Sequence, residues 1–168
     1  MAAKAKTRKS EDFVPSAALI AKIIRQGNWM VRADDGKRVS YGSFRWNPPG
    51  EWTEAKDWNE TPECGGGLHG QDARHGGMIQ GNTFRFCETH GKHVAIGTDK
   101  VKVRRARILL NELPSGLTFS GDLSLRGCTS LASLPENLSV GGWLDLSGSS
   151  WAKKTLPKGW KIKGDILR

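Results

Sequence analysis

The sequence predicts an α+β protein in which one N-terminal helix packs against an antiparallel sheet, continued by a short repeated β array. An amphipathic stretch with helical spacing lies near the N-terminus, and stretches of alternating apolar residues follow it. From residue 113 onward the chain repeats itself, with spacings of 21 and 22 residues. We therefore expect a basic, disordered tail over residues 1–12, an α+β domain over 13–110 and a repeat array over 111–168.

The predicted helix lies within the stretch FVPSAALIAKIIRQG, residues 13–27. Ser16 can accept a hydrogen bond from a free N–H group of the first turn, and Gly27 suits the left-handed residue that follows a helix. The spacing places four apolar side chains on one face: Leu19, Ile20, Ile23 and Ile24.

Strands are predicted from alternating or β-branched apolar residues. They are expected at about residues 29–33, 38–44, 83–87, 94–96 and 101–108. Asp35-Gly36 is a strong turn signal, so we expect the first two strands to form a hairpin. The stretch RWNPPGEWTEAKDW contains adjacent prolines and is expected to be a long ordered loop.

Three tryptophans, Trp46, Trp52 and Trp58, lie in this loop. Tryptophan in an irregular segment usually anchors the chain in a core. The alternative is a stacking platform for nucleic-acid bases or a surface for a partner.

The formal net charge of +9 equals the sum of two segments, residues 1–27 with +4 and residues 100–108 with +5. The first includes the tail, with Lys4, Lys6, Arg8 and Lys9. The second is the run KVKVRRARI, with Lys100, Lys102, Arg104, Arg105 and Arg107 and no acidic residue. Strand alternation puts the first three of these on one face, which we expect to be solvated and available to an anionic partner.

The stretch ECGGGLHG, residues 63–70, admits several interpretations. A phosphate-binding loop would normally have a lysine directly after its glycines, and here Leu-His follows. A nucleophilic cysteine would need a base that no spacing supplies. A structural zinc site is a further alternative, with the ligands Cys64, His69, Cys87 and His90, although the spacing of the first pair is unusual. The remaining interpretation is a turn that the fold requires, with no cofactor.

The repeat begins with Leu-Pro at residues 113, 134 and 156. Each unit has two short stretches of alternating apolar residues, one before and one after a glycine. Such units bury their apolar side chains only by stacking on one another. The pattern resembles the short leucine-rich repeats of bacterial and phage proteins, with Gly127 and Gly148 near the position that asparagine usually occupies. An array of so few units would be unstable on its own. We therefore expect it to be continuous with the sheet before it.

Residues 28–110 resemble a small phage and prophage domain with a Cys-x-x-Gly-(Phe or Leu)-His signature. The match comprises Cys64, Gly67, Leu68 and His69, followed by a strand and a lysine-rich strand. The resemblance implies a short helix after the histidine and leaves the function open.

A more distant resemblance is to the NAD-binding core of ADP-ribosyltransferases. It would place His69 where a tyrosine is usual and would require a later glutamate, for which Glu88 and Glu112 are available. No clear first motif of that family precedes His69.

We therefore expect a non-enzymatic binding protein of a phage or mobile element, which contacts a nucleic acid or a host nucleoprotein such as a defence complex. The alternatives are an ADP-ribosyltransferase-like enzyme that uses NAD and a structural virion component. The odd number of cysteines and the absence of a long apolar run predict a cytoplasmic protein without a membrane partner.

Overall fold

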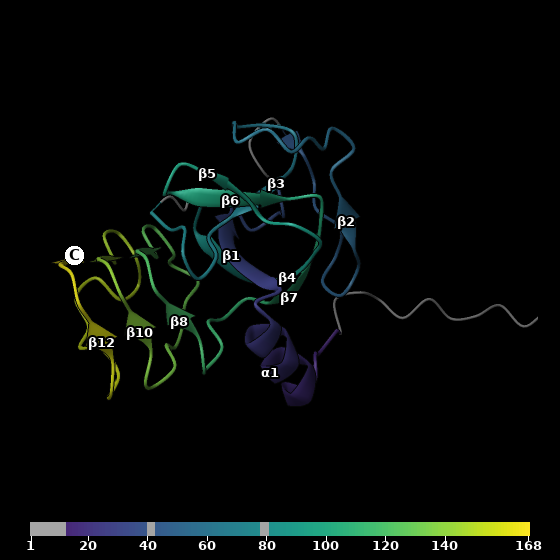
Figure 1. The fold of residues 1–168 in the computed structure, drawn as a ribbon. Helices are drawn as coiled ribbons and strands as arrows, with labels where there is room; N and C mark the ends of the chain where they lie inside the picture. The colour runs from purple at the N-terminus through teal and green to yellow at the C-terminus, as the bar shows by residue number, and fades with distance from the viewer. Residues whose placement is uncertain (1–12, 40–42, 78–80) are drawn as a thin grey trace, which may run out of the picture.

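The computed structural model describes residues 13–39, 43–77 and 81–168. Its one helix in these ranges, α1 (Ala17–Gln26), begins and ends as predicted. The Ser16 side chain accepts a hydrogen bond from the N–H of Leu19, and Gly27 adopts a left-handed conformation with φ of 70°. Figure 1 shows the helix below the sheets, with the repeat array extending to one side.

A four-stranded antiparallel sheet forms the centre of the protein. Its strands lie in the order β1 (Trp29–Asp34), β4 (Thr83–His90), β7 (Arg105–Leu110) and β2 (Thr53–Glu54). All six residues of β1 are buried, which means that both faces of the sheet are covered along this strand.

A second antiparallel sheet covers one face of the first. It has the order β3 (Leu68–Gly70), β6 (Lys100–Val103) and β5 (Val94–Ile96). The predicted strand at 101–108 is therefore two strands in two sheets, and Arg104 lies between them. A bridge between Val31 and Gln71 joins β1 to the residue that follows β3, so the two sheets are connected there as well as through Arg104.

The predicted repeats form two ladders of short parallel strands. One ladder has the order β12 (Lys161–Ile162), β10 (Ser139–Val140) and β8 (Thr118–Phe119). The other has the order β13 (Ile166–Leu167), β11 (Leu144–Asp145) and β9 (Leu123–Ser124). Phe119, Val140 and Ile162 pair in register, at the sequence period seen in the Leu-Pro units.

The two faces of the central sheet belong to different hydrophobic cores. One core unites Ile23 of α1 with Trp29, Phe84 and Phe86 of the sheet and with the leucines of the array. The expected continuity between array and sheet is therefore present. The other core lies between the sheets and includes Met30, Trp46, Leu68, Cys87 and Ile108.

Two sequence-based expectations about local structure are wrong. The hairpin does not form, because β1 pairs with β4, whose phenylalanines extend the first core. Of the predicted strand at 38–44, residues 40–42 lie outside the described residues, and Val39 makes only a single bridge, to Arg45. The short helix implied after His69 is also absent from residues 70–77, where Gln71 instead bonds to Val31 and to the array.

The described part of the chain has no helix with the length and apolar character that a membrane span requires.

Candidate functional site

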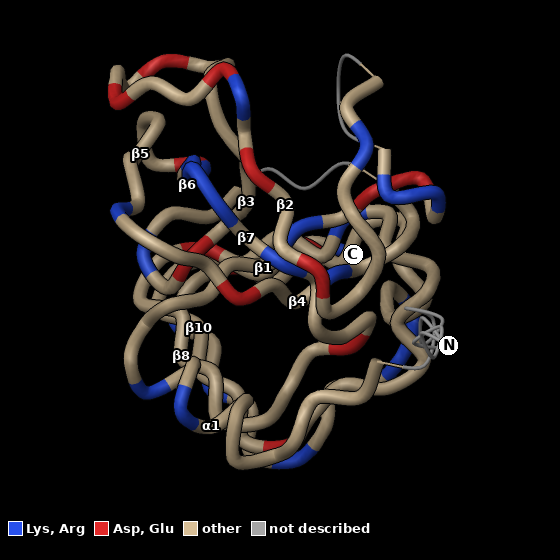
Figure 2. The backbone as a smooth tube through the Cα atoms, turned by 90° about the vertical axis from the view of Figure 1, so that its right-hand side faces the viewer, with Lys and Arg blue, Asp and Glu red and all other residues tan. Residues whose placement is uncertain are grey.

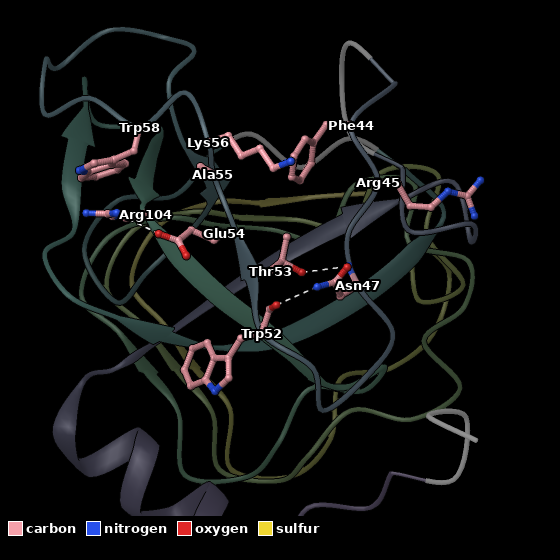
Figure 3. Close-up of a pocket in the computed structure, with 10 residues that line it drawn as sticks. All are labelled: Phe44, Arg45, Asn47, Trp52, Thr53, Glu54, Ala55, Lys56, Trp58 and Arg104. Atoms are coloured by element: carbon pink, nitrogen blue, oxygen red, sulfur yellow. Dashed lines mark hydrogen bonds and ion pairs between the residues drawn. The ribbon is translucent and has the colours of Figure 1, made fainter. Parts of the chain in front are cut away.

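A cleft of about 740 Å³ opens beside β2, and we name it the aromatic–basic cleft. Its lining residues are Phe44, Arg45, Asn47, Trp52, Thr53, Glu54, Ala55, Lys56, Trp58 and Arg104. Figure 3 shows the rings of Phe44, Trp52 and Trp58 at separate corners, with Thr53 and Glu54 between them. Two of the three tryptophans singled out in the sequence therefore face one cleft.

Hydrogen bonds fix the irregular chain on which these rings stand. The Thr53 Oγ1 accepts from the Asn47 N–H at 2.9 Å, and the Asn47 side-chain amide donates to the Trp52 carbonyl at 2.8 Å. Thr53 itself pairs with Ala106 of β7. The loop around the prolines is thus ordered by the sheet, as expected for this segment.

Three exposed cationic side chains line the same cleft: Arg45, Lys56 and Arg104. The Arg104 Nε donates to the Glu54 carboxylate at 3.0 Å, and both side chains are more than half exposed, so this pair contributes little stability. Arg45 and Lys56 form no ion pair with any described residue. Their charges remain available to an anion from solution.

Arg105 and Arg107 contact Trp52 outside the lining of the cleft. Their guanidinium carbons lie 4.7 and 4.8 Å from the centre of the indole ring. Arg107 also pairs with Glu88 at 2.6 Å, and both partners are largely buried. Figure 2 shows basic and acidic stretches of the chain close together around β6 and β7, and two arginines of the run KVKVRRARI are paired with Glu54 and Glu88.

The expectation that Lys102 is solvated is wrong. Lys102 is fully buried, and its Nζ donates to the Asn59 Oδ1 at 2.8 Å and to the Gly65 carbonyl at 3.0 Å. The Trp58 ring lies 6.0 Å from this ammonium group. The loop that carries Cys64 and the three glycines folds over the charged face of β6, so Lys102 cannot contact a partner. Lys100, on the same face, is only partly buried.

Trp46 differs from the other two tryptophans because it is only 1% exposed and belongs to the core between the sheets. The Arg32 guanidinium lies 4.3 Å from its ring centre. Trp46 is therefore an anchor and is not available for stacking. The basic tail residues Lys4, Lys6, Arg8 and Lys9 lie outside the described residues.

The four zinc ligands considered from the sequence do not come together. Among the described residues, which include all four, no group of three or more His, Cys, Asp or Glu side chains could hold a metal ion. Cys87 belongs to the inter-sheet core, where burial raises the pKa of its thiol to about 12. Since zinc binds a thiolate, this position does not fit a ligand. Cys64 is exposed, and His90 lies against Trp52.

The glycine run has a packing role. Gly66 has φ of 58°, and a side chain there would collide with Asn59. Gly70 lies so close to β1 that a Cβ would be 2.8 Å from the Val31 carbonyl oxygen. These glycines allow the loop to close over Lys102 and β3 to approach β1.

Sequence reasoning missed a polar cluster around Asp72. Its carboxylate is bonded to the Nδ1 atoms of His75 at 3.0 Å and His93 at 3.1 Å, and the other ring nitrogen of His93 bonds to the Thr89 hydroxyl at 2.8 Å. Burial alone would raise the pKa of Asp72, but these histidines and two backbone N–H groups lower it well below its usual range. Thr89 is 3% exposed, so the cluster presents no nucleophile to substrate.

No protein-family model, curated protein or solved structure matches the chain.

Proposed function

We propose that the protein binds single-stranded nucleic acid through the aromatic–basic cleft. The observation that carries this proposal is the presence of three aromatic rings and three exposed cations around one cleft. Proteins that bind single strands combine cations, which follow the phosphates, with rings on which bases stack. Such binding tolerates many sequences because every base has a π face.

The roles within the cleft follow from the exposure of its side chains. Trp58 and Phe44 would stack bases, while Arg45, Lys56 and Arg104 would contact phosphates. Trp52, already in contact with two guanidinium groups, would form the floor. We also propose that the protein comes from a phage or mobile element and that the bound strand belongs to a host nucleoprotein. This part of the proposal rests on the resemblance of residues 28–110 alone.

The enzyme alternative draws less support from the geometry. His69 lines a different cavity, and neither Glu88 nor Glu112 is among the residues around it. Glu88 is paired with Arg107. A non-enzymatic binding protein therefore remains our proposal.

Fluorescence anisotropy with labelled oligothymidylate, its RNA counterpart and a DNA duplex tests the proposal. The variant Arg45→Gln/Lys56→Gln/Arg104→Gln should weaken single-strand binding and reduce the salt slope by about 2, since each phosphate contact contributes about 0.7. Trp58→Ala should cost about 1–3 kcal/mol of binding. The matched control Lys153→Gln/Lys161→Gln/Lys163→Gln removes the same charge from the exposed surface of the array.

If the two triple variants lost the same single-strand affinity, only net charge would matter for binding, and the cleft would be overturned as the site. Failure of all three nucleic acids to bind at low salt would overturn nucleic-acid binding. If, in addition, an acidic protein from lysate were retained after nuclease treatment, the cleft would be reassigned to a protein partner.

A further inference from the structure

One acidic side chain, Glu54, lines the aromatic–basic cleft among the residues that the structure describes. A cleft that only attracts phosphates gains nothing from a carboxylate, because like charges repel each other. The ion pair between Glu54 and Arg104 is more than half exposed on both sides and contributes little stability. The carboxylate therefore has a place in the binding surface that neither phosphate attraction nor the stability of the fold explains.

Glu54 is held by β2, the edge strand of the central sheet. It pairs with Arg105 of β7, and a side chain on a strand is positioned more precisely than one on a loop. Figure 3 shows the Glu54 carboxylate turned toward Arg104, between the rings of Trp58 and Trp52. A base that stacks on a ring lies parallel to it, and its hydrogen-bonding edge points sideways. A base stacked on either tryptophan can therefore turn this edge toward the pair of Glu54 and Arg104.

The pair offers donors on one side and acceptors on the other. The Arg104 Nε donates to the Glu54 Oε1 at 3.0 Å, and among the described residues only Arg104 bonds to this carboxylate. A guanidinium group has five N–H donors in one plane, and each carboxylate oxygen can accept more than one hydrogen bond. The pair therefore presents N–H donors next to two acceptor oxygens.

This order of groups matches the edge of one base. Guanine presents an acceptor, O6, followed by two donors, N1–H and the N2 amino group. Adenine and cytosine would each place a donor against the guanidinium group and a ring nitrogen acceptor against the carboxylate. Thymine and uracil have one N–H between two carbonyl groups, so one carbonyl would face a carboxylate oxygen.

We propose, on the basis of the single-strand binding proposed above, that the aromatic–basic cleft prefers guanine at one position of the strand. The N1–H and N2 amino groups of the base donate to Glu54, and its O6 accepts from Arg104, while its ring stacks on Trp58. Arg45 and Lys56 hold the neighbouring phosphates. Stacking alone tolerates every base, so Glu54 is the residue that determines the preference.

Fluorescence anisotropy of the full chain with a set of labelled oligonucleotides tests this proposal. Each is an oligothymidylate whose central base is thymine, guanine, adenine or hypoxanthine. Guanine and adenine are both purines and stack alike, so their comparison isolates the hydrogen-bonding edge. The guanine oligonucleotide should bind on the order of tenfold more tightly than the adenine one. Hypoxanthine keeps O6 and N1–H but lacks the N2 amino group, and it should lie between them.

A variant of the same size as the wild type tests the role of Glu54. Glu54→Gln replaces one acceptor oxygen by an amide donor and should bring the guanine and adenine oligonucleotides to similar affinity. Glu60→Gln is the matched control, because Glu60 forms an equally exposed pair with Lys92 at 3.0 Å and does not line the cleft. This control should keep the preference for guanine.

The proposal is overturned if the wild type binds the guanine and adenine oligonucleotides equally well, or if the preference for guanine survives in Glu54→Gln. It is also overturned if hypoxanthine binds as tightly as guanine. In these outcomes single-strand binding at the cleft still stands wherever oligothymidylate binds and the triple variant of the cleft weakens that binding. If no oligonucleotide of the set binds at low salt, both proposals are overturned.

Discussion

The repeat array and the two-sheet region differ in where their stabilising partners lie along the chain. In the array each strand pairs with the strand one period away, as Leu144 does with Leu123 and Ile166. In the two-sheet region, buried polar groups find partners at distant, irregular positions: Arg85 bonds to Asp34, and Lys102 to Asn59. The array is therefore a sum of similar neighbour contacts, whereas the sheets depend on a few specific long-range ones.

The largest expected effect comes from Asp34 in the two-sheet region. Its carboxylate has a fully buried side chain and is bonded by two buried arginines, at 2.9 Å from the Arg85 Nε and 3.3 Å from Arg32. Asp34→Ala would remove the buried carboxylate that both arginines contact and should lower the free energy of unfolding by about 3–5 kcal/mol. Urea denaturation measures this. Asp35→Ala, on the same turn, is the control, and the prediction is wrong if both variants lose the same stability.

Replacing an apolar side chain of the array by alanine should cost less stability in the last repeat than in the middle one. Leu144, in the middle strand, is fully buried, and Leu144→Ala should cost about 3 kcal/mol through lost burial and a cavity. Ile166 occupies the same position in the last repeat and is 38% exposed, so Ile166→Ala should cost about 1 kcal/mol or less. Denaturation of both variants checks the gradient. Equal costs would mean that the last repeat is as well packed as the middle one.

A substitution at Lys102 tests whether its buried ammonium group holds the glycine loop in place. Lys102→Met keeps the apolar stem and leaves the Asn59 and Gly65 oxygens without their donor, at a cost of about 2 kcal/mol. The change should also increase hydrogen exchange at Gly65–Gly67. Lys100→Met, two residues away on the same strand, is the matched control. Equal stability of wild type and Lys102→Met would show that the ammonium group is not needed.

The smallest effect, and one that depends on pH, is expected at Asp72. The folded state lowers the pKa of this carboxyl, so its stabilising contribution is complete above the ordinary aspartate value of about 4 and is lost as the pH falls through and below it. Because the group is partly exposed, we expect Asp72→Asn to cost only about 1 kcal/mol near neutral pH. The difference from wild type should shrink in acid, as urea unfolding at both conditions would show. A constant difference would contradict the role of the charge.

Much of the fold could be predicted because its signals are local. The cap at Ser16, the stop at Gly27 and the alternation of Phe84 and Phe86 depend on the preferences of a few neighbouring residues. The repeat spacing also predicted which array strands pair, since stacked units must align equivalent positions.

The candidate site could be predicted only in part. Composition identified the tryptophans and the basic strand, and Trp52, Trp58 and Arg104 do line one cleft. Sequence reasoning did not predict three residues that line the cleft: Phe44, Arg45 and Lys56. No periodicity marks an exposed residue in an irregular loop. The Asp72 cluster was missed because it joins residues from separate segments.

The sequence by itself determined the helix, the strands at about 29–33, 83–87 and 94–96 and the repeat period of the array, because each depends on residues close in the chain or one period apart. Tertiary structure alone decided which side of β6 faces solvent. A loop from residues 59–67 covers that strand. Lys102 is therefore buried and donates hydrogen bonds to the loop, and it is not part of a contact surface. The exposure of a strand depends on which distant segment packs over it, and no local pattern in the sequence records that contact.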